Sequence, residues 1–169
     1  DLDGTMVHTL GDFQMALHRT MADLDFPPVT DALIEQTIGK GSEHLIRSLL
    51  EHQVNLLGSK GQGRASPDLT VDALFDRAWQ IYQNHYLQVN GMFSDVYPGV
   101  LQALESFAAQ GIPMACLTNK PLSFAKTLLK NKSLDQFFGP VFGGDSFESK
   151  KPDPLPIIKT CQALGTPVN

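Results

Sequence analysis

The sequence has few cysteines and lacks a long apolar run. Among its 169 residues are two cysteines, Cys116 and Cys161, which lie far apart and belong to no CxxC pair. They do not support a zinc site, a redox motif or a disulfide framework, so a reducing cytoplasm is the simplest compartment. The longest apolar runs, such as residues 112–117, are far shorter than the roughly 20 residues that span a bilayer.

Clustered basic charge is also missing. The 13 lysines and arginines are scattered, and 18 acidic residues bring the formal net charge to −5. The electrostatic footprint of a nucleic-acid-binding protein is therefore lacking. Hydrophobic residues make up 42% of the chain and charged residues 18%, an ordinary balance for a globular protein. We expect a small molecule as partner, with no nucleic acid and no membrane, whereas the sequence does not specify an oligomeric state.

The first part of the chain has helical periodicity. Apolar residues recur at helical spacing from Leu10 to the Pro27-Pro28 break. Thr30 and Ser42 are candidate caps for two further helices, and Thr70 opens a fourth. These helices would end near Gly39, Leu57 and residue 90, with a glycine-rich loop over Gly58–Pro67. We therefore predict an all-helical block over residues 10–91.

Helices and strands alternate in the second part. Helices are expected over Val100–Gln110, Leu122–Asn131 and Pro154–Leu164, with short apolar strands at 112–117 and 141–143 between them. Such alternation is typical of an α/β layer with parallel strands. We predict a Rossmann-like parallel-sheet core made from residues 1–9 and 92–169, with the helical block inserted near its start as a cap.

The strongest chemical signal is the motif Asp1-Leu2-Asp3-Gly4-Thr5. Two carboxylates at alternate positions of an extended backbone point the same way and can share one metal ion. The first can attack phosphorus, while the second gives a proton to the leaving alcohol and later takes one from water. A surface acidic turn or a piece of a calcium loop is the alternative, but a calcium loop needs further oxygen ligands that His8 and Leu10 do not provide.

Two later motifs complete the candidate site. Thr118 and Asn119 follow a buried strand, where ligands collect in parallel sheets, and are candidates for binding phosphate oxygens. A helix cap or Asx turn is the alternative for this pair. Lys151, in Lys150-Lys151-Pro152-Asp153-Pro154, could offset the repulsion between a phosphate dianion and Asp1. A solvated surface lysine is the alternative there, and the proline spacing favours Lys151 over Lys150.

These three motifs, in this order, resemble those of the haloacid dehalogenase superfamily: DxDGT, a hydrophobic strand ending in Thr or Ser, and Lys-Pro-x-Pro. The resemblance covers the whole chain and implies a helical cap inserted into a Rossmann-like core. It also implies that Asp1 is the nucleophile, Asp3 the general acid/base, and Thr118 and Lys151 the groups that bind the phosphoryl group. Mg²⁺ would be held by Asp1 and the backbone carbonyl of Asp3.

Within that superfamily, residues 37–46 are similar to bacterial phosphoglycolate phosphatases, which implies that the substrate is 2-phosphoglycolate. Lys40 is then a candidate contact for the substrate carboxylate. The alternative is an interhelical turn with an exposed lysine. Phosphatases of other sugar phosphates or of pyrophosphate remain open. A dehalogenase would have no use for Asp3, and the cap arginine of beta-phosphoglucomutase has no counterpart, since Glu43 follows Ser42.

Two departures from the family pattern bear on activity. His8 stands where the family usually has an aspartate, which changes the local charge near neutral pH. The fourth motif, an acidic strand that supplies another metal ligand, would be expected after Asn169, and another strand before Asp1. We therefore expect a fragment that binds Mg²⁺ poorly by itself, and a non-catalytic member that uses its cap for binding is the rival interpretation.

Overall fold

The computed structural model describes residues 1–59 and 70–167. The chain separates into two compact units, one made of 1–9 and 90–169 and the other of Leu10–Val89. We refer to them as the core unit and the helical unit. The sequence places the second boundary at residue 91 and the structure places it at Val89. Part of the predicted Gly58–Pro67 loop, residues 60–67, lies outside the described residues.

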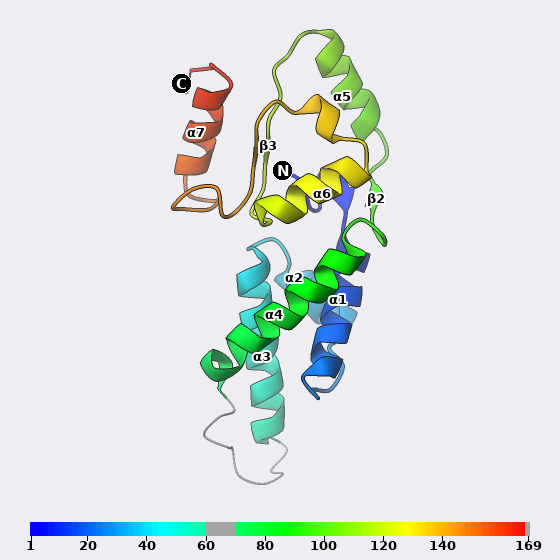
Figure 1. The fold of residues 1–169 in the computed structure, drawn as a ribbon, viewed down its shortest axis with the longest axis vertical. Coiled ribbons are helices and arrows are strands. Elements are labelled where there is room, and N and C mark those ends of the chain that lie inside the picture. The colour runs from blue at the N-terminus through cyan, green and yellow to red at the C-terminus, as the bar shows by residue number, and fades with distance from the viewer. Residues whose placement is uncertain (60–69, 168–169) are drawn as a thin grey trace. The chain divides into compact units, whose positions relative to one another are not determined.

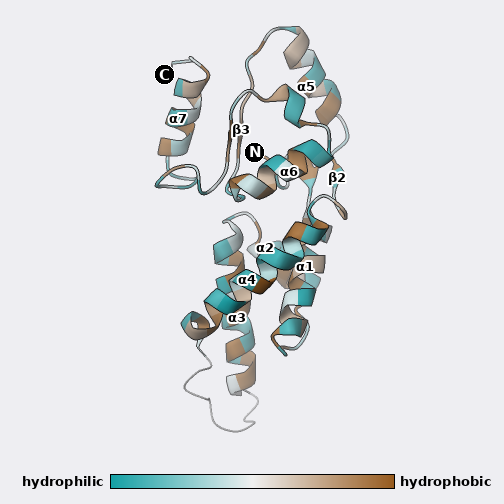
Figure 2. Cartoon of the chain, in the orientation of Figure 1, coloured by the Kyte–Doolittle hydropathy of each residue, from teal (hydrophilic) through white to brown (hydrophobic). Residues whose placement is uncertain are grey.

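The helical unit contains four helices, which are drawn from blue to green in Figure 1. They are α1 (Leu10–Asp23), α2 (Asp31–Thr37), α3 (Ser42–Ser59) and α4 (Val71–Val89). Helix α4 packs against both α1 and α3. The Tyr86 ring of α4 lies against Phe13 of α1, with ring centroids 5.2 Å apart. Apolar and polar segments alternate along these helices in Figure 2, so each can bury one face in this core.

The predicted cap at Thr30 is confirmed, and Thr70, predicted to open a long helix, also caps its helix. The Thr30 hydroxyl accepts a hydrogen bond from Leu33 N, and the Thr70 hydroxyl accepts one from Ala73 N. The prediction for Ser42 was wrong by one residue, because Ser42 already belongs to α3 and the Gly41 carbonyl accepts the first helical bond, from Leu45 N. Gly41 has φ of 96°, a conformation that glycine adopts without steric cost.

The core unit contains two short pairs of strands. Strands β3 (Cys116–Leu117) and β4 (Val141–Phe142) are parallel, with Cys116 opposite Val141. Strands β1 (Val7–His8) and β2 (Asp95–Val96) are antiparallel, with Val7 opposite Val96. The mixed helical and parallel-sheet fold predicted from the alternating pattern is confirmed. The antiparallel pair was not predicted. Its two strands lie near the points in the sequence where the chain leaves the core unit and returns to it.

The three remaining helices follow the predicted order, and a short 3₁₀ helix that was not predicted lies among them. They are α5 (Val100–Ala109), α6 (Leu122–Asn131), the short 3₁₀ helix η1 (Asp135–Phe137) and α7 (Leu155–Ala163). Helices α5 and α7 end before Gly111 and Gly165, which have φ of 69° and 67°. The buried core includes side chains from the first motif, β1, β3, α5 and α6: Leu2, Met6, Val7, Leu104, Cys116, Ala125, Leu128 and Leu129.

The first predicted strand is shorter than its apolar run suggested. Only Cys116 and Leu117 pair in β3, whereas the sequence favoured residues 112–117. Ile112 N instead bonds to Phe107 O at the end of α5, and the Ile112 side chain is 44% exposed. Pro113 lacks an N–H group for a ladder, so the run begins as a helix-closing loop and only its end becomes a strand.

Candidate functional site

The first motif forms a tight turn in the core unit. Gly4 N donates to Val7 O, and the amides of Met6 and Val7 both donate to Leu2 O. Gly4 has φ of 72°, a conformation that glycine adopts at little energetic cost and other residues rarely adopt. Leu2 is fully buried and anchors this turn in the core. The carboxylates of Asp1 and Asp3 flank this buried residue.

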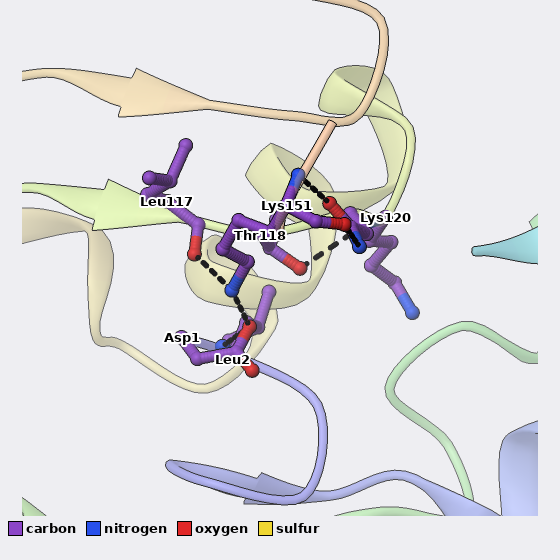
Figure 3. A network of polar contacts seen from close by, with 7 residues as sticks. Asp1, Leu2, Leu117, Thr118, Lys120 and Lys151 are labelled. Atoms are coloured by element: carbon purple, nitrogen blue, oxygen red, sulfur yellow. Dashed lines mark hydrogen bonds and ion pairs between the residues drawn. The ribbon is translucent and has the colours of Figure 1, made fainter. Parts of the chain in front are cut away.

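Asp1 is bound at one carboxylate oxygen by two donors. Its Oδ1 lies 2.8 Å from Lys151 Nζ and accepts a hydrogen bond of 2.9 Å from Leu2 N. The Lys151 ammonium also donates to the Leu117 carbonyl, at 3.1 Å, as the dashed lines in Figure 3 show. The lysine chosen from the proline spacing therefore reaches the predicted nucleophile, whereas the neighbouring Lys150 is exposed.

Asp3 pairs with a lysine to which the sequence assigned no role. Lys120 Nζ lies 2.9 Å from Asp3 Oδ1, and the side chains are 1% and 14% exposed. The Lys120 amide donates to Thr118 Oγ1 at 3.2 Å, so the hydroxyl of the second motif faces the same network. Thr118 itself is buried. In the sequence, the one feature that could have indicated a role for Lys120 is its place two residues after Thr118.

Asn119 links the second motif to the third. Its Nδ2 donates to the Lys151 carbonyl at 2.9 Å, and its Oδ1 accepts from the Lys151 amide at 3.0 Å. Five predicted residues therefore belong to two sets of contacts: Lys151 contacts Asp1 and Asn119, and Lys120 contacts Asp3 and Thr118. The two sets are joined by the consecutive residues 118–120 of the backbone. Their assigned chemical roles stay predictions.

A glycine pair after β4 packs against this segment. A Cβ atom added to Gly144 would lie 2.3 Å from Asn119 O, and one added to Gly143 would lie 2.4 Å from Leu122 N. Gly144 N also donates to Lys120 O at 2.8 Å. Only glycine allows so close an approach between backbones. Sequence reasoning missed this pair, although its position directly after a strand was a usable signal.

Asp145 follows the glycine pair and caps α6 from outside the helix. Its Oδ1 accepts a hydrogen bond of 2.8 Å from Leu122 N, the first amide of α6, while Pro121 at the N-cap supplies no side-chain bond. A carboxylate at this end of a helix satisfies an otherwise unpaired amide and complements the helix dipole. The loop after β4 therefore fixes where α6 begins, directly after Lys120.

Burial governs the electrostatics beneath Asp1. Burial lowers the pKa of Lys151 from its ordinary value, while the nearby Asp3 carboxylate acts in the opposite sense. The Cys116 thiol in β3 is fully buried, and burial raises its pKa to about 11. The thiol is therefore neutral at physiological pH and serves as a packing group, while the cations of the network come from Lys120 and Lys151.

The donors near Asp1 can be compared with the needs of Mg²⁺. Within 1–59 and 70–167, no three His, Cys, Asp or Glu side chains are grouped to hold a metal ion. Mg²⁺ is commonly bound by one or two carboxylates with substrate phosphates and water. The Asp1 carboxylate and the Asp3 carbonyl are oxygen donors of this type, so these residues fit such an ion as part of its ligand set.

Lys40 and His8 lie outside this network of contacts. Lys40 is exposed in the turn between α2 and α3 of the helical unit, so its contact with a substrate stays a prediction. His8 in β1 is exposed, and its ring makes an edge contact with Tyr97 at 5.6 Å between centroids.

No described helix is long and apolar enough to cross a membrane.

The sequence and the fold were compared with known proteins. The family model for haloacid dehalogenase-like hydrolases matches residues 1–169. The chain belongs to the haloacid dehalogenase-like hydrolase family. The motif resemblance seen in the sequence is thus confirmed.

Similar members of this hydrolase family carry one activity in their names. A phosphoglycolate phosphatase from Thiobacillus denitrificans is 36% identical over 165 residues, covering 98% of this chain and 67% of that protein. A plasmid phosphoglycolate phosphatase from Cupriavidus necator is 35% identical, covering 97% of this chain and 65% of that protein. The chain thus spans about two thirds of the length of these relatives.

A solved hydrolase structure shares the fold. The crystal structure of a predicted phosphoglycolate phosphatase from Haemophilus somnus superposes with a TM-score of 0.82 at 27% identity. The match covers 98% of this chain and 70% of that one. This chain therefore shares its fold with that solved structure.

Proposed function

We propose that the complete protein is a phosphatase that hydrolyses a small phosphate monoester, with 2-phosphoglycolate as its substrate. The observation that carries this proposal is the ion pair of Lys151 with Asp1, at 2.8 Å. A carboxylate nucleophile next to a fixed cation can meet an anionic phosphate without prohibitive repulsion. The names of the relatives from Thiobacillus denitrificans and Cupriavidus necator support the choice of substrate.

In the proposed first step, a carboxylate oxygen of Asp1 attacks phosphorus, and the bond from phosphorus to the alcohol oxygen breaks. The contacts of Leu2 N and Lys151 Nζ with Oδ1 orient that carboxylate. Asp3, in its protonated form, delivers a proton to the departing oxygen. The products of this step are the free alcohol and an aspartyl-phosphate at Asp1.

In the proposed second step, water attacks the phosphorus of the aspartyl-phosphate, and the Asp3 carboxylate takes a proton from that water. The Asp1 carboxylate leaves and inorganic phosphate is released. Thr118 can donate its hydroxyl hydrogen to a phosphate oxygen, because its Oγ1 already accepts from Lys120 N. Mg²⁺, when held by Asp1 and the Asp3 carbonyl, would supply further positive charge for the phosphate oxygens.

The substrate is tested with the full-length protein. Initial rates are measured on 2-phosphoglycolate, a sugar phosphate and pyrophosphate, each with and without Mg²⁺. We expect the highest kcat/KM for 2-phosphoglycolate and loss of activity when Mg²⁺ is chelated. A preference for another ester would overturn the substrate, and inactivity on the whole panel would favour a binding role instead.

Lys40 provides a separate test of substrate choice. If its ammonium contacts the substrate carboxylate, Lys40→Ala should raise KM for 2-phosphoglycolate by about tenfold, as loss of one charged hydrogen bond does. The same variant should act normally on ethyl phosphate, which has no carboxylate. Equal losses on both esters would show that Lys40 does not read the carboxylate.

A cytoplasmic location is part of this proposal and stays a prediction. Cys116 and Cys161 are both free thiols, which suits a reducing compartment. Cell fractionation followed by detection of the full-length protein checks it, and recovery from an oxidising compartment would contradict it.

A further inference from the structure

The amide side chain of Asn119 forms a reciprocal pair with one residue's backbone. Nδ2 donates to Lys151 O at 2.9 Å, and Oδ1 accepts from Lys151 N at 3.0 Å. Because an amide has distinct donor and acceptor ends, the two bonds together fix its orientation. Asn119 therefore pairs with Lys151 as a neighbouring strand would, across 32 positions of sequence.

The other end of Lys151 is held by the same segment. Its Nζ donates to Leu117 O at 3.1 Å and meets Asp1 Oδ1 at 2.8 Å. A lysine side chain has four rotatable bonds and loses considerable entropy when fixed. Residues 117–119 bind both the backbone and the ammonium of Lys151. These contacts restrict the lysine side chain to conformations in which its ammonium contacts Asp1.

The 117–120 segment has anchors of its own. Thr118 N donates to Phe142 O at 3.0 Å, and Gly144 N donates to Lys120 O at 2.8 Å. Neither bond involves the Asn119 side chain. Loss of that side chain should therefore release the Lys151 loop while β3, β4 and the segment between them stay in place.

We propose that Asn119 is a positioning residue whose side chain fixes the place of the Lys151 loop, and that this side chain does not act as a contact for the substrate. This inference rests on the proposed function of the site. It differs from the expectation drawn from the sequence, in which Asn119 binds phosphate oxygens. The difference is testable, because a positioning residue acts only through Lys151 and a ligand contact acts by itself.

The test is a double-mutant cycle in the full-length protein, with the affinity for inorganic phosphate measured by calorimetry. We expect Asn119→Ala to weaken phosphate binding about tenfold, the size of a lost hydrogen bond. Lys151→Ala should weaken it at least as much, and the double variant should match Lys151→Ala. Additive losses would overturn the proposal, and so would an unchanged affinity in Asn119→Ala.

A second measurement reports directly on the loop. Amide hydrogen exchange at Lys151 should become faster in Asn119→Ala, while exchange at Cys116 in β3 stays slow. Asn131→Ala is the matched control, since Asn131 Nδ2 also donates to a backbone carbonyl, that of Asn90, at 3.1 Å. It should leave both phosphate affinity and Lys151 exchange unchanged. Unaltered exchange at Lys151 in Asn119→Ala would contradict the proposal.

An isosteric variant separates the loss of the hydrogen bonds from the loss of side-chain volume. Asn119→Asp keeps an acceptor for Lys151 N but places a carboxylate oxygen against Lys151 O, so it should be at least as impaired as Asn119→Ala. Wild-type behaviour in Asn119→Asp would overturn the proposal. Binding and exchange are read without turnover, so an inactive wild type would remove the proposed function and still leave this inference decided by its own data.

Discussion

Lys120 and Asp3 form an ion pair of 2.9 Å between residues 117 positions apart in the sequence. The lysine side chain is 1% exposed and the carboxylate 14%. This ion pair connects the segment after β3 to the first motif. Lys151 forms a second ion pair, with Asp1, so each carboxylate of the DxD motif is paired with a different lysine.

Removal of the Lys120 ammonium should destabilise the fold. In Lys120→Met, the Asp3 carboxylate keeps its partial burial but loses its cation, and we expect the free energy of unfolding to fall by about 2 kcal/mol. Urea denaturation measures it. Lys126→Met is the matched control, because Lys126 is an exposed lysine in α6. Similar stability in the two variants would show that the buried pair contributes nothing.

A methyl group at Gly144 should disturb the site through the backbone. The new Cβ in Gly144→Ala would stand 2.3 Å from Asn119 O and 2.9 Å from Asn119 C, and backbone atoms cannot rotate away. We expect a loss of about 3 kcal/mol in the free energy of unfolding, as for overpacked sites. Urea denaturation measures this loss.

Gly139→Ala serves as its control. The nearest atom to a Cβ at Gly139 is Met114 O, at 3.9 Å, which is ordinary van der Waals contact. Its stability should change by less than about 1 kcal/mol. If both alanine variants are equally stable, the close approach of Gly144 to Asn119 is absent from the folded protein.

Cys116 should make stability fall at high pH. Burial raises its pKa from 9.0 to about 11, so the folded state holds the thiol proton more tightly than the unfolded state does. The resulting stabilisation is complete below about pH 9 and is lost as pH rises towards 11. Cys116→Ala should therefore show a flatter fall in free energy of unfolding over that interval than the wild type.

Thiol labelling checks the same burial at neutral pH. Cys116 is fully buried, whereas Cys161 in α7 is partly exposed. Iodoacetamide should modify Cys161 in the native protein and reach Cys116 only after unfolding. Equal labelling of the two cysteines in the native state would contradict the packing around β3.

Much of the fold could be predicted from local pattern. Helix α6 occupies Leu122–Asn131, the range that the sequence favoured, because its apolar spacing and flanking turn residues act within one element. The choice of Lys151 over Lys150 likewise came from nearby prolines. Such features depend on residues close in sequence, where periodicity and turn chemistry are informative.

The features that escaped prediction depend on distant partners. Strands β1 and β2 have two residues each, too few for any alternation to be visible. In the sequence, nothing distinguishes Lys120 from other lysines, because its contact with Asp3 is formed only in the folded chain. Glycine is needed at position 144 only because the Asn119 backbone lies so close to it. No local rule encodes these contacts, because each is created by tertiary packing.

The nucleophilic role of Asp1 is tested by locating the phosphoryl group during turnover. The full-length protein is mixed with 2-phosphoglycolate labelled at phosphorus, quenched in acid, and the labelled peptide is identified, with Asp1→Asn in parallel. We expect label on Asp1 in the wild type and neither label nor turnover in Asp1→Asn. Turnover that persists in Asp1→Asn, or label on another residue, would contradict it.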